Sequence, residues 1–389
     1  MEAAQVLPRS KPKLIWVNIL FFIFTGFLAL MSPFYVWRYG LAWQEIALFA
    51  LFTAATGLSI TVGYHRYFAH RTFEANPVVN FLVLFFGAAA FEQSALYWAS
   101  QHRDHHRYVD TDRDPYNIKK GFFYAHIGWL IFWEHTIDYD NVRDLQKNKL
   151  LVHQNDSYLL WAVSSGVLLP LLIGFLTGHL LGALLVGVGA RLALVHHSTF
   201  SINSVCHTFG KATYDIYASA RDHWFVAFLT NGEGYHNFHH RFAGDYRNGV
   251  RWYQWDPSKW AIAILAKLGL AWDLKRVSRF SVLHAKLAAE HRRAHDLLLK
   301  ARLHHRLDKI RESLKTQYDK LLERLSHWET ISNKYQSFII DKASAFRAAR
   351  LRVLATRETH ARHQFRKAYR EWAYLIKGQL PNPELLSYY

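Results

Sequence analysis

The chain has 389 residues, of which 51% are hydrophobic and 16% aromatic, and it carries a formal net charge of +17. Its one cysteine, Cys206, excludes an internal disulfide and an iron–sulfur cluster held by the chain's own cysteines. The mean hydropathy of -0.08 conceals a division, because apolar runs crowd the first half of the chain and charged residues crowd its end. No recognisable nucleic-acid-binding module accompanies the excess of basic residues, so we expect no nucleic-acid partner.

Four apolar runs are long enough to cross a bilayer, whose hydrocarbon core of ~30 Å requires about 20 helical residues. Residues 14–36 and 43–63 form a first pair, and residues 158–177 and 180–200 form a second. The first run is not expected to be a cleaved signal peptide, because it is long and aromatic, contains Pro33 and lacks a small-residue cleavage site. The chain is therefore predicted to be an integral, multi-pass membrane protein.

The distribution of cations predicts the orientation of these spans. Arg9, Lys11 and Lys13 precede the first span, so the positive-inside rule places the N-terminus in the cytosol. Four crossings return the C-terminus to the same side. Residues 77–99 begin with an apolar run that is short for a span, and we expect them to form one amphipathic helix that lies in the membrane interface or packs on the spans.

Histidines gather in three clusters beside the apolar runs. In two of them the spacing is i, i+3 and i+4, which on a helix gathers three imidazoles within about 100° of arc, aimed at one point. His65 and His70 would lie about 140° apart on an ideal helix, so they either serve different ions or straddle a helix end. The clusters are His65 and His70; His102, His105 and His106; and His236, His239 and His240.

These eight imidazoles exceed what one four- to six-coordinate ion can bind, so the clusters indicate a centre with two metal ions. Neutral imidazole suits zinc, copper, nickel or iron. Scattered surface or core histidines would explain any one of these residues, but not three clusters with nearly repeated spacing. Because all ligands of one centre must converge, the three clusters are expected on the cytosolic side.

The end of the chain is predicted to be a separate basic helical extension, residues 281–389, following a membrane domain over residues 1–280. Residues 280–389 contain 22 Lys and Arg against 11 Asp and Glu. Apolar residues recur at steps of three and four from Leu303 to Tyr335, which indicates a long amphipathic helix in a hairpin or an interrupted coiled coil. Residues 343–377 read as a further basic helix. A solvated helical face explains most of these charges, and the extension could also bind anionic membrane lipid, dock the electron donor or mediate oligomerisation.

The clusters, their order and the four spans resemble those of the membrane fatty acid desaturases, particularly the delta-9 group that includes the stearoyl-CoA desaturases. The resemblance covers roughly residues 14–280. Residues 232–240, Gly-Glu-Gly-Tyr-His-Asn-Phe-His-His, look like the third histidine box of that group, and Asp114-Pro115 with residues 121–129 resembles the segment after the second box. The resemblance implies an all-α fold, with four transmembrane helices and a cytosolic helical cap that holds a di-iron centre.

The same resemblance adds a ninth histidine. Asn203-Ser-Val-Cys-His207 is similar to the family's Asn-Ser-x-x-His segment, in which the histidine binds metal and the asparagine approaches the second ion through water. Iron also suits the chemistry, because zinc has no redox chemistry, and of the metals that imidazole binds only iron and copper commonly activate dioxygen. The implied metal set is His65, His70, His102, His105, His106, His207, His236, His239 and His240, with Asn203 acting through water.

The implied activity is a dioxygen-dependent desaturase that inserts a cis double bond, at the delta-9 position, into a long-chain acyl-CoA or acyl-lipid. No catalytic residue beyond the metal centre and no motif for an organic cofactor is expected. Electrons must come from a separate reductase with a ferredoxin or cytochrome b5-type carrier, because no haem-binding segment is visible in the chain. The alternatives are a lipid hydroxylase of the same histidine-box superfamily and a metal transporter, which would have ligands inside the spans.

The residues expected to bind the coenzyme A group of the substrate differ from those of the animal acyl-CoA enzymes. Where those enzymes have arginine, an Arg-Lys pair and tryptophan, this chain has Ser100, Trp133-Glu134 and Phe200. Either other cations bind coenzyme A, or the acyl carrier is a membrane lipid. The candidate substrate residues are Tyr64 and Trp98 as walls of an acyl tunnel, Lys119 and Lys120 as phosphate ligands or plain surface lysines, and Phe200.

Overall fold

The computed structural model describes residues 13–133, 137, 139–300, 304–340 and 347–379. The chain divides into two compact units: the first contains the residues up to 212 with 217–277, and the second contains 213–216 with the residues from 278 onwards. Arg9, Lys11, Glu134 and Leu303, which entered the predictions above, lie outside the described residues.

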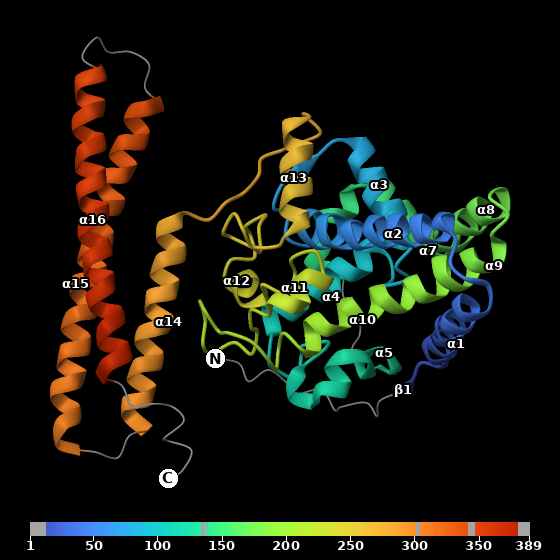
Figure 1. Ribbon diagram of the computed structural model, residues 1–389, viewed down its shortest axis with the longest axis horizontal. Coiled ribbons are helices and arrows are strands. Elements are labelled where there is room, and N and C mark those ends of the chain that lie inside the picture. The colour runs from blue at the N-terminus through green and yellow to red at the C-terminus, as the bar shows by residue number, and fades with distance from the viewer. Residues whose placement is uncertain (1–12, 134–136, 138, 301–303, 341–346, 380–389) are drawn as a thin grey trace. The chain divides into compact units, whose positions relative to one another are not determined.

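Four apolar helical spans form the framework of the first unit (Figure 1). Large side chains such as Leu20, Phe24 and Phe27 are more than half exposed on the first span, as a bilayer-facing surface requires. The prediction of four spans in an all-α fold is confirmed. The spans are α1 (Trp16–Tyr39); α2 (Trp43–Leu58) with η1 (Ser59–Ala69); α7 (Tyr158–Val163), η6 (Ser164–Leu168) and α8 (Leu169–Leu176); and α9 (Leu180–Gly182), η7 (Ala183–Ala190) and α10 (Arg191–Ser204).

The predicted single helix over residues 77–99 is wrong, because two helices occupy this region. α3 (Pro77–Ala88) and α4 (Ala95–Tyr108) are separated by a break in which Phe91 and Gln93 adopt positive φ angles of 56° and 75°. Ser94 caps the second helix by accepting a hydrogen bond from the amide of Tyr97 at 3.1 Å. On the other side of the break, Arg191 donates to the carbonyl of Ala89 at 2.8 Å. These contacts stop one helix and start another that points the second histidine box inward.

Short elements complete the first unit. Two minimal antiparallel ladders pair β1 (Lys13–Leu14) with β3 (Phe132–Trp133) and β2 (Glu74–Ala75) with β4 (Ala271–Trp272). The remaining helices are η2 (Ile118–Lys120), η3 (Tyr124–Gly128), α5 (Trp129–Ile131), η4 (Tyr139–Val142), η5 (Leu145–Lys147), α6 (Lys149–Asp156), α11 (Trp224–Leu229), α12 (His236–Arg241) and α13 (Pro257–Lys267).

The second unit is a bundle of three helices, α14 (Arg279–Lys300), α15 (His304–Ile340) and α16 (Arg347–Gln379). α15 and α16 lie side by side as a hairpin, and α14 packs against them (Figure 1). Their apolar stripes meet in a core that includes Leu287, Leu321 and the fully buried Trp372. The prediction of a C-terminal helical extension is confirmed. Of the two arrangements left open the hairpin is present, and α15 is continuous through the four-residue steps that suggested an interruption.

Candidate metal centre

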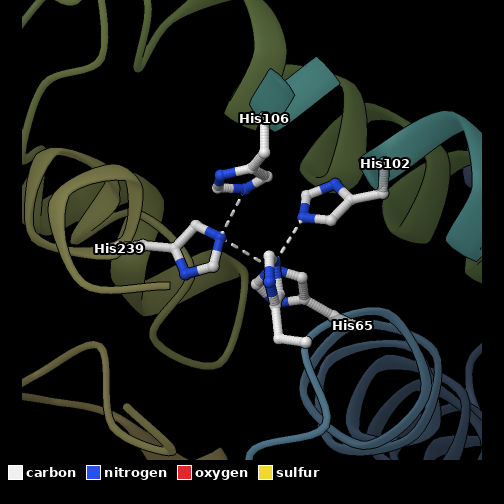
Figure 2. A group of neighbouring side chains, drawn as sticks. His65, His102, His106 and His239 are labelled. Carbon is white, nitrogen blue, oxygen red and sulfur yellow. Dashed lines mark hydrogen bonds between the residues drawn. The ribbon is translucent and has the colours of Figure 1, made fainter. Parts of the chain in front are cut away.

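The structure brings the nine predicted histidines into two groups of buried or half-buried imidazoles. Within each group the candidate ligand atoms all lie within 4.8 Å of one another. Figure 2 shows four members of the first group, whose rings converge from η1, α4 and α12. The first group is His65, His70, His102, His106 and His239, and the second is His105, His207, His236 and His240. The groups adjoin, since the rings of His106 and His240 stack with centroids 4.3 Å apart.

Each helical box serves both groups, so the expectation that one box aims at one point is wrong. On α4, His102 and His106 belong to the first group and His105 belongs to the second. Residues four apart lie about 40° apart on a helix, whereas adjacent residues lie about 100° apart. α12 divides in the same way, with only His239 in the first group. The two helices therefore face the boundary between the groups.

His65 and His70 belong to the same group, which contradicts the option that they serve different ions. The other option is confirmed, because His65 lies within η1 and His70 is the capping residue directly after its end. The amide of His70 donates to the carbonyl of His65 at 3.0 Å, closing a five-residue turn. Such a wide turn stacks residues i and i+5, which an α-helix would separate, and turns of this kind often mark functional sites.

Buried carboxylates orient a histidine in each group. Nδ1 of His65 lies 2.7 Å from a carboxylate oxygen of Glu233, and the Nδ1–H of His105 donates to Asp114 at 2.8 Å. A histidine fixed at Nδ1 presents its Nε2 lone pair to a metal, and a carboxylate partner makes that nitrogen more basic. In the second group, Nδ1 of His207 pairs with the Ser219 hydroxyl at 2.6 Å. The donor set therefore fits two first-row transition metal ions.

Glu233 is itself held by a buried network. Arg66 donates to Glu233 at 2.9 Å and also contacts Asp256 at 3.0 Å, while the side-chain amide of Asn248 donates to Glu233 at 2.6 Å. The adjacent Gly232 has a φ of 107°, and a Cβ there would approach the Asp256 carboxylate to 2.5 Å. Glycine before the glutamate is thus required for the network to close.

Burial and mutual repulsion favour the neutral form of His70, His102 and His239. Desolvation first, and then neighbouring imidazoles, hold the pKa of His70, His102 and His239 well below the usual histidine value. Neutral imidazole is the form that binds metal. Burial alone would raise the pKa of Asp114 and of Glu233. The neighbouring His105 outweighs burial at Asp114, and His65 with Arg66 outweighs it at Glu233, so that both pKa values are lowered. The carboxylates are therefore ionised at neutral pH.

A mostly apolar cavity of about 580 Å³ reaches from the spans to the histidines. Of the predicted substrate residues, Trp98 and Phe200 line it, and Asn203 lines it together with His65, His102 and His236. Tyr64 does not line it, because this ring is fully buried behind Trp98, at 6.3 Å between centroids.

The two predicted cations lie away from the cavity wall. Lys119 donates to the carbonyl of Asp110 at 2.7 Å, and Lys120 lies over the ring of Tyr124 at 4.7 Å. Neither lysine lines the cavity. These positions favour the interpretation of both as surface lysines.

Glu92, which the sequence reasoning missed, is a carboxyl group in the cavity wall. Its Oε1 is buried and has no hydrogen-bond partner in the described part of the chain. Burial raises its pKa to about 7, and hydrogen bonds with Thr199 and Trp98 only partly oppose that shift. The only signal in the sequence is an acidic residue directly after an apolar run.

We expect acyl-chain binding to weaken with rising pH because of Glu92. Below pH 7 the Glu92 carboxyl group is neutral. Above pH 7 it is ionised, and a bound acyl chain must then remove water from a charged carboxylate. Between about pH 6 and pH 8 the affinity of the purified protein for a non-reactive acyl analogue should fall about tenfold. Glu92→Gln should bind the analogue with little pH dependence, as measured by tryptophan fluorescence titration. Equal pH slopes in the two proteins would contradict this role.

The fold and site define a membrane protein with a buried, two-part histidine centre at the end of an apolar cavity. Residues 41–273 match the sequence model of the fatty acid desaturase family. The chain belongs to this family.

Three curated proteins illustrate the similarity. A probable acyl-CoA desaturase of Schizosaccharomyces pombe is 43% identical over 227 residues, covering 58% of this chain and 47% of the relative. Acyl-CoA desaturase 1 of Saccharomyces cerevisiae is 37% identical over 256 residues, covering 64% and 50%. An sn-2 palmitoyl-lipid 9-desaturase of Nostoc sp. is 32% identical over 269 residues, covering 67% and 90%. The chain thus spans about half the length of the two yeast relatives.

Proposed function

We propose that this chain is a dioxygen-dependent di-iron fatty acyl desaturase, which forms a cis double bond at the delta-9 position of a long-chain acyl substrate. One observation carries the proposal: two adjoining histidine groups meet the end of an apolar cavity in a chain of the desaturase family. Two iron ions, when bound, supply the dioxygen chemistry that removes hydrogen from unactivated carbon. The nine histidines would hold these ions, and Asn203 would act through water.

The chain's own residues would bind and orient the substrate. The apolar cavity wall would hold the acyl chain of the substrate and exclude water. Trp98 stacks on His102, with ring centroids 4.7 Å apart, and would bring the acyl chain close to the first histidine group. Glu233 and Asp114 would hold the rings of His65 and His105 in place through Nδ1. In the overall reaction one hydrogen would leave each of two adjacent carbons, and dioxygen with two electrons and two protons supplied from outside would be reduced to two waters.

The nature of the product separates the desaturase from the histidine-box hydroxylase. We would express the full chain in a host that lacks delta-9 unsaturation and analyse its fatty acids by mass spectrometry. A new cis-monounsaturated chain supports the proposal, an alcohol supports the hydroxylase, and neither product in the presence of a competent electron donor overturns both. Family membership disfavours a metal transporter, and of the nine histidines only His65 lies within the bounds of an apolar span.

The acyl carrier is proposed to be either coenzyme A or a membrane lipid. Two of the curated relatives are acyl-CoA desaturases by name, and another is a palmitoyl-lipid desaturase. Lys119 and Lys120 lie off the cavity wall, which weakens their case as coenzyme A ligands. Supplying purified membranes with labelled acyl-CoA or labelled phospholipid, and following which label enters the unsaturated product, distinguishes the two carriers.

We further propose that both termini and the metal centre face the cytosol, where a separate electron carrier docks on the basic second unit. Arg352, Arg366, Arg370 and Lys377 are exposed and lie within about 40° of one another around α16. The two described acids of α16 are paired elsewhere in the bundle, Glu358 with Arg279 at 3.2 Å and Glu371 with Lys320 at 3.4 Å. The face therefore suits an acidic partner.

Reversing two charges on this face should weaken donor coupling. Arg366→Glu with Arg370→Glu is expected to raise the KM for an acidic carrier about tenfold at low salt and to leave kcat unchanged, because such charges act mainly on encounter. Arg357→Glu, compared with Arg366→Glu alone, is the matched control, since Arg357 is exposed on α16 but lies about 180° from Arg366. Equal effects of the two variants, or no effect of either, would exclude docking here.

A further inference from the structure

α13 exposes an apolar stripe on an otherwise well-anchored helix. Trp260, Ile264 and Leu268 follow one another at four-residue steps and are 40%, 56% and 66% exposed, and Trp272 just beyond them is 47% exposed. Residues at this spacing share one face of a helix. A soluble surface rarely presents such a contiguous apolar stripe unless something covers it.

The stripe continues onto α11. The rings of Phe228 and Trp255 lie 5.3 Å apart, and those of Trp255 and Trp260 lie 5.5 Å apart. Beyond Phe228, which is 55% exposed, Trp224 is 74% exposed. We call the whole set the aromatic face; its members are Trp224, Phe225, Phe228, Trp255, Trp260, Ile264, Leu268 and Trp272.

The inner side of α13 is fixed firmly, so the exposure of the aromatic face does not come from a loose helix. Lys259 donates three hydrogen bonds to backbone carbonyls, including that of Gly249 at 2.6 Å. Asp256 caps the helix by accepting from the Lys259 amide at 3.0 Å. Ile262 is fully buried in a core shared with Val62. The aromatic residues are therefore held outward by the fold.

α13 also lies where the second span leaves the bilayer. Val62 belongs to η1, the continuation of α2, and β4 directly after α13 pairs with β2, which leads into the apolar helix α3. Figure 1 shows the axis of α13 running across the direction of α2. A helix that crosses the end of a span lies in the plane of the membrane, and tryptophan concentrates at that depth.

We propose that the aromatic face is a bilayer contact, seated among the lipid headgroups and upper acyl chains. Continuity with the apolar spans argues for lipid as the occupant. Phe228 and Leu229 of α11 also line the acyl cavity, so this contact places one cavity wall against the bilayer. The proposal rests on the spans and does not depend on the proposed reaction.

Site-directed labelling tests this proposal directly, because the one native cysteine, Cys206, is fully buried. Ile264→Cys and Leu268→Cys would each carry an environment-sensitive fluorophore in the full chain, reconstituted in phosphatidylcholine nanodiscs. Phe24→Cys on the exposed face of α1 is the lipid control, and Lys147→Cys at an exposed polar site is the water control.

The expected result is quenching by a lipid whose nitroxide lies high on the acyl chain, at least about twofold stronger for the Ile264 and Leu268 labels than for the Lys147 label. Iodide in the water should quench the Lys147 label most strongly. Quenching of the α13 labels by iodide alone would overturn the proposal. Protection from both quenchers would overturn it as well, because a second copy of the chain or another protein segment would then cover the face.

Discussion

His105→Ala is expected to abolish desaturation and to remove about one metal ion per chain. His105 belongs to the smaller group, so its loss leaves three imidazoles, and it connects that group to the Asp114 carboxylate. Loss of an outer partner of a ligand costs about 10- to 100-fold in metal affinity or activity, so loss of the ligand should cost more than about 100-fold. Metal content by mass spectrometry and product formation by fatty acid analysis measure the two effects together.

His197→Ala is the matched control for this prediction, because His197 is an exposed histidine on α10 outside both groups. The control should keep its full metal content and most of its activity. If His105→Ala retains two ions and a normal rate, the assignment of the second histidine group fails.

Glu233→Gln is expected to destabilise the protein and to weaken metal binding at the first group. The substitution keeps the side-chain shape but removes the charge that faces Arg66 at 2.9 Å and His65 at 2.7 Å. Arg66 is 1% exposed, and breaking a buried ion pair typically costs about 3–5 kcal/mol. Loss of the support at His65 should lower metal affinity by about 10- to 100-fold. Thermal unfolding in nanodiscs and titration with a chelator measure these effects separately.

Asp114→Asn provides the comparison. It removes a carboxylate of the same kind from His105 in the other group, but Asp114 has no arginine partner among the described ion pairs. We therefore expect similar weakening of metal binding with a smaller loss of stability. Equal destabilisation by the two substitutions would contradict the special role assigned to the Arg66 network.

The histidine spacing pointed to eight of the nine members of the two histidine groups but not to their grouping, and His207 was added by the family resemblance. Spans of about 20 apolar residues and repeated histidine spacing are local properties, so they can be recognised in one sequence. The pairing of His65 with His70 depends on the wide turn of η1, and the division of α4 depends on where α12 meets it. Neither relation is local in the chain.

The supporting residues were missed for a related reason. Arg66 and Glu233 are separated by 167 residues and meet only in the folded protein. The sequence held a weak signal for Glu233, which stands between two glycines shortly before the histidines of the third box. At both glycines another part of the protein comes so close that a Cβ has no room. The break that turns α4 inward was also missed, since it depends on Arg191, a residue of the fourth span.

The carboxylates that contact His65 and His105 determine whether the protein can fold before it binds metal. Arg66, Asn248 and the carboxylates form their contacts with one another and with the imidazole nitrogens that face away from the metal positions. Folding alone can therefore set the ligand orientations, and metal loading becomes a late step in biogenesis. If iron is the metal, as proposed above, a cell starved of iron would accumulate a folded, inactive pool, and activity would return on resupply without new protein synthesis.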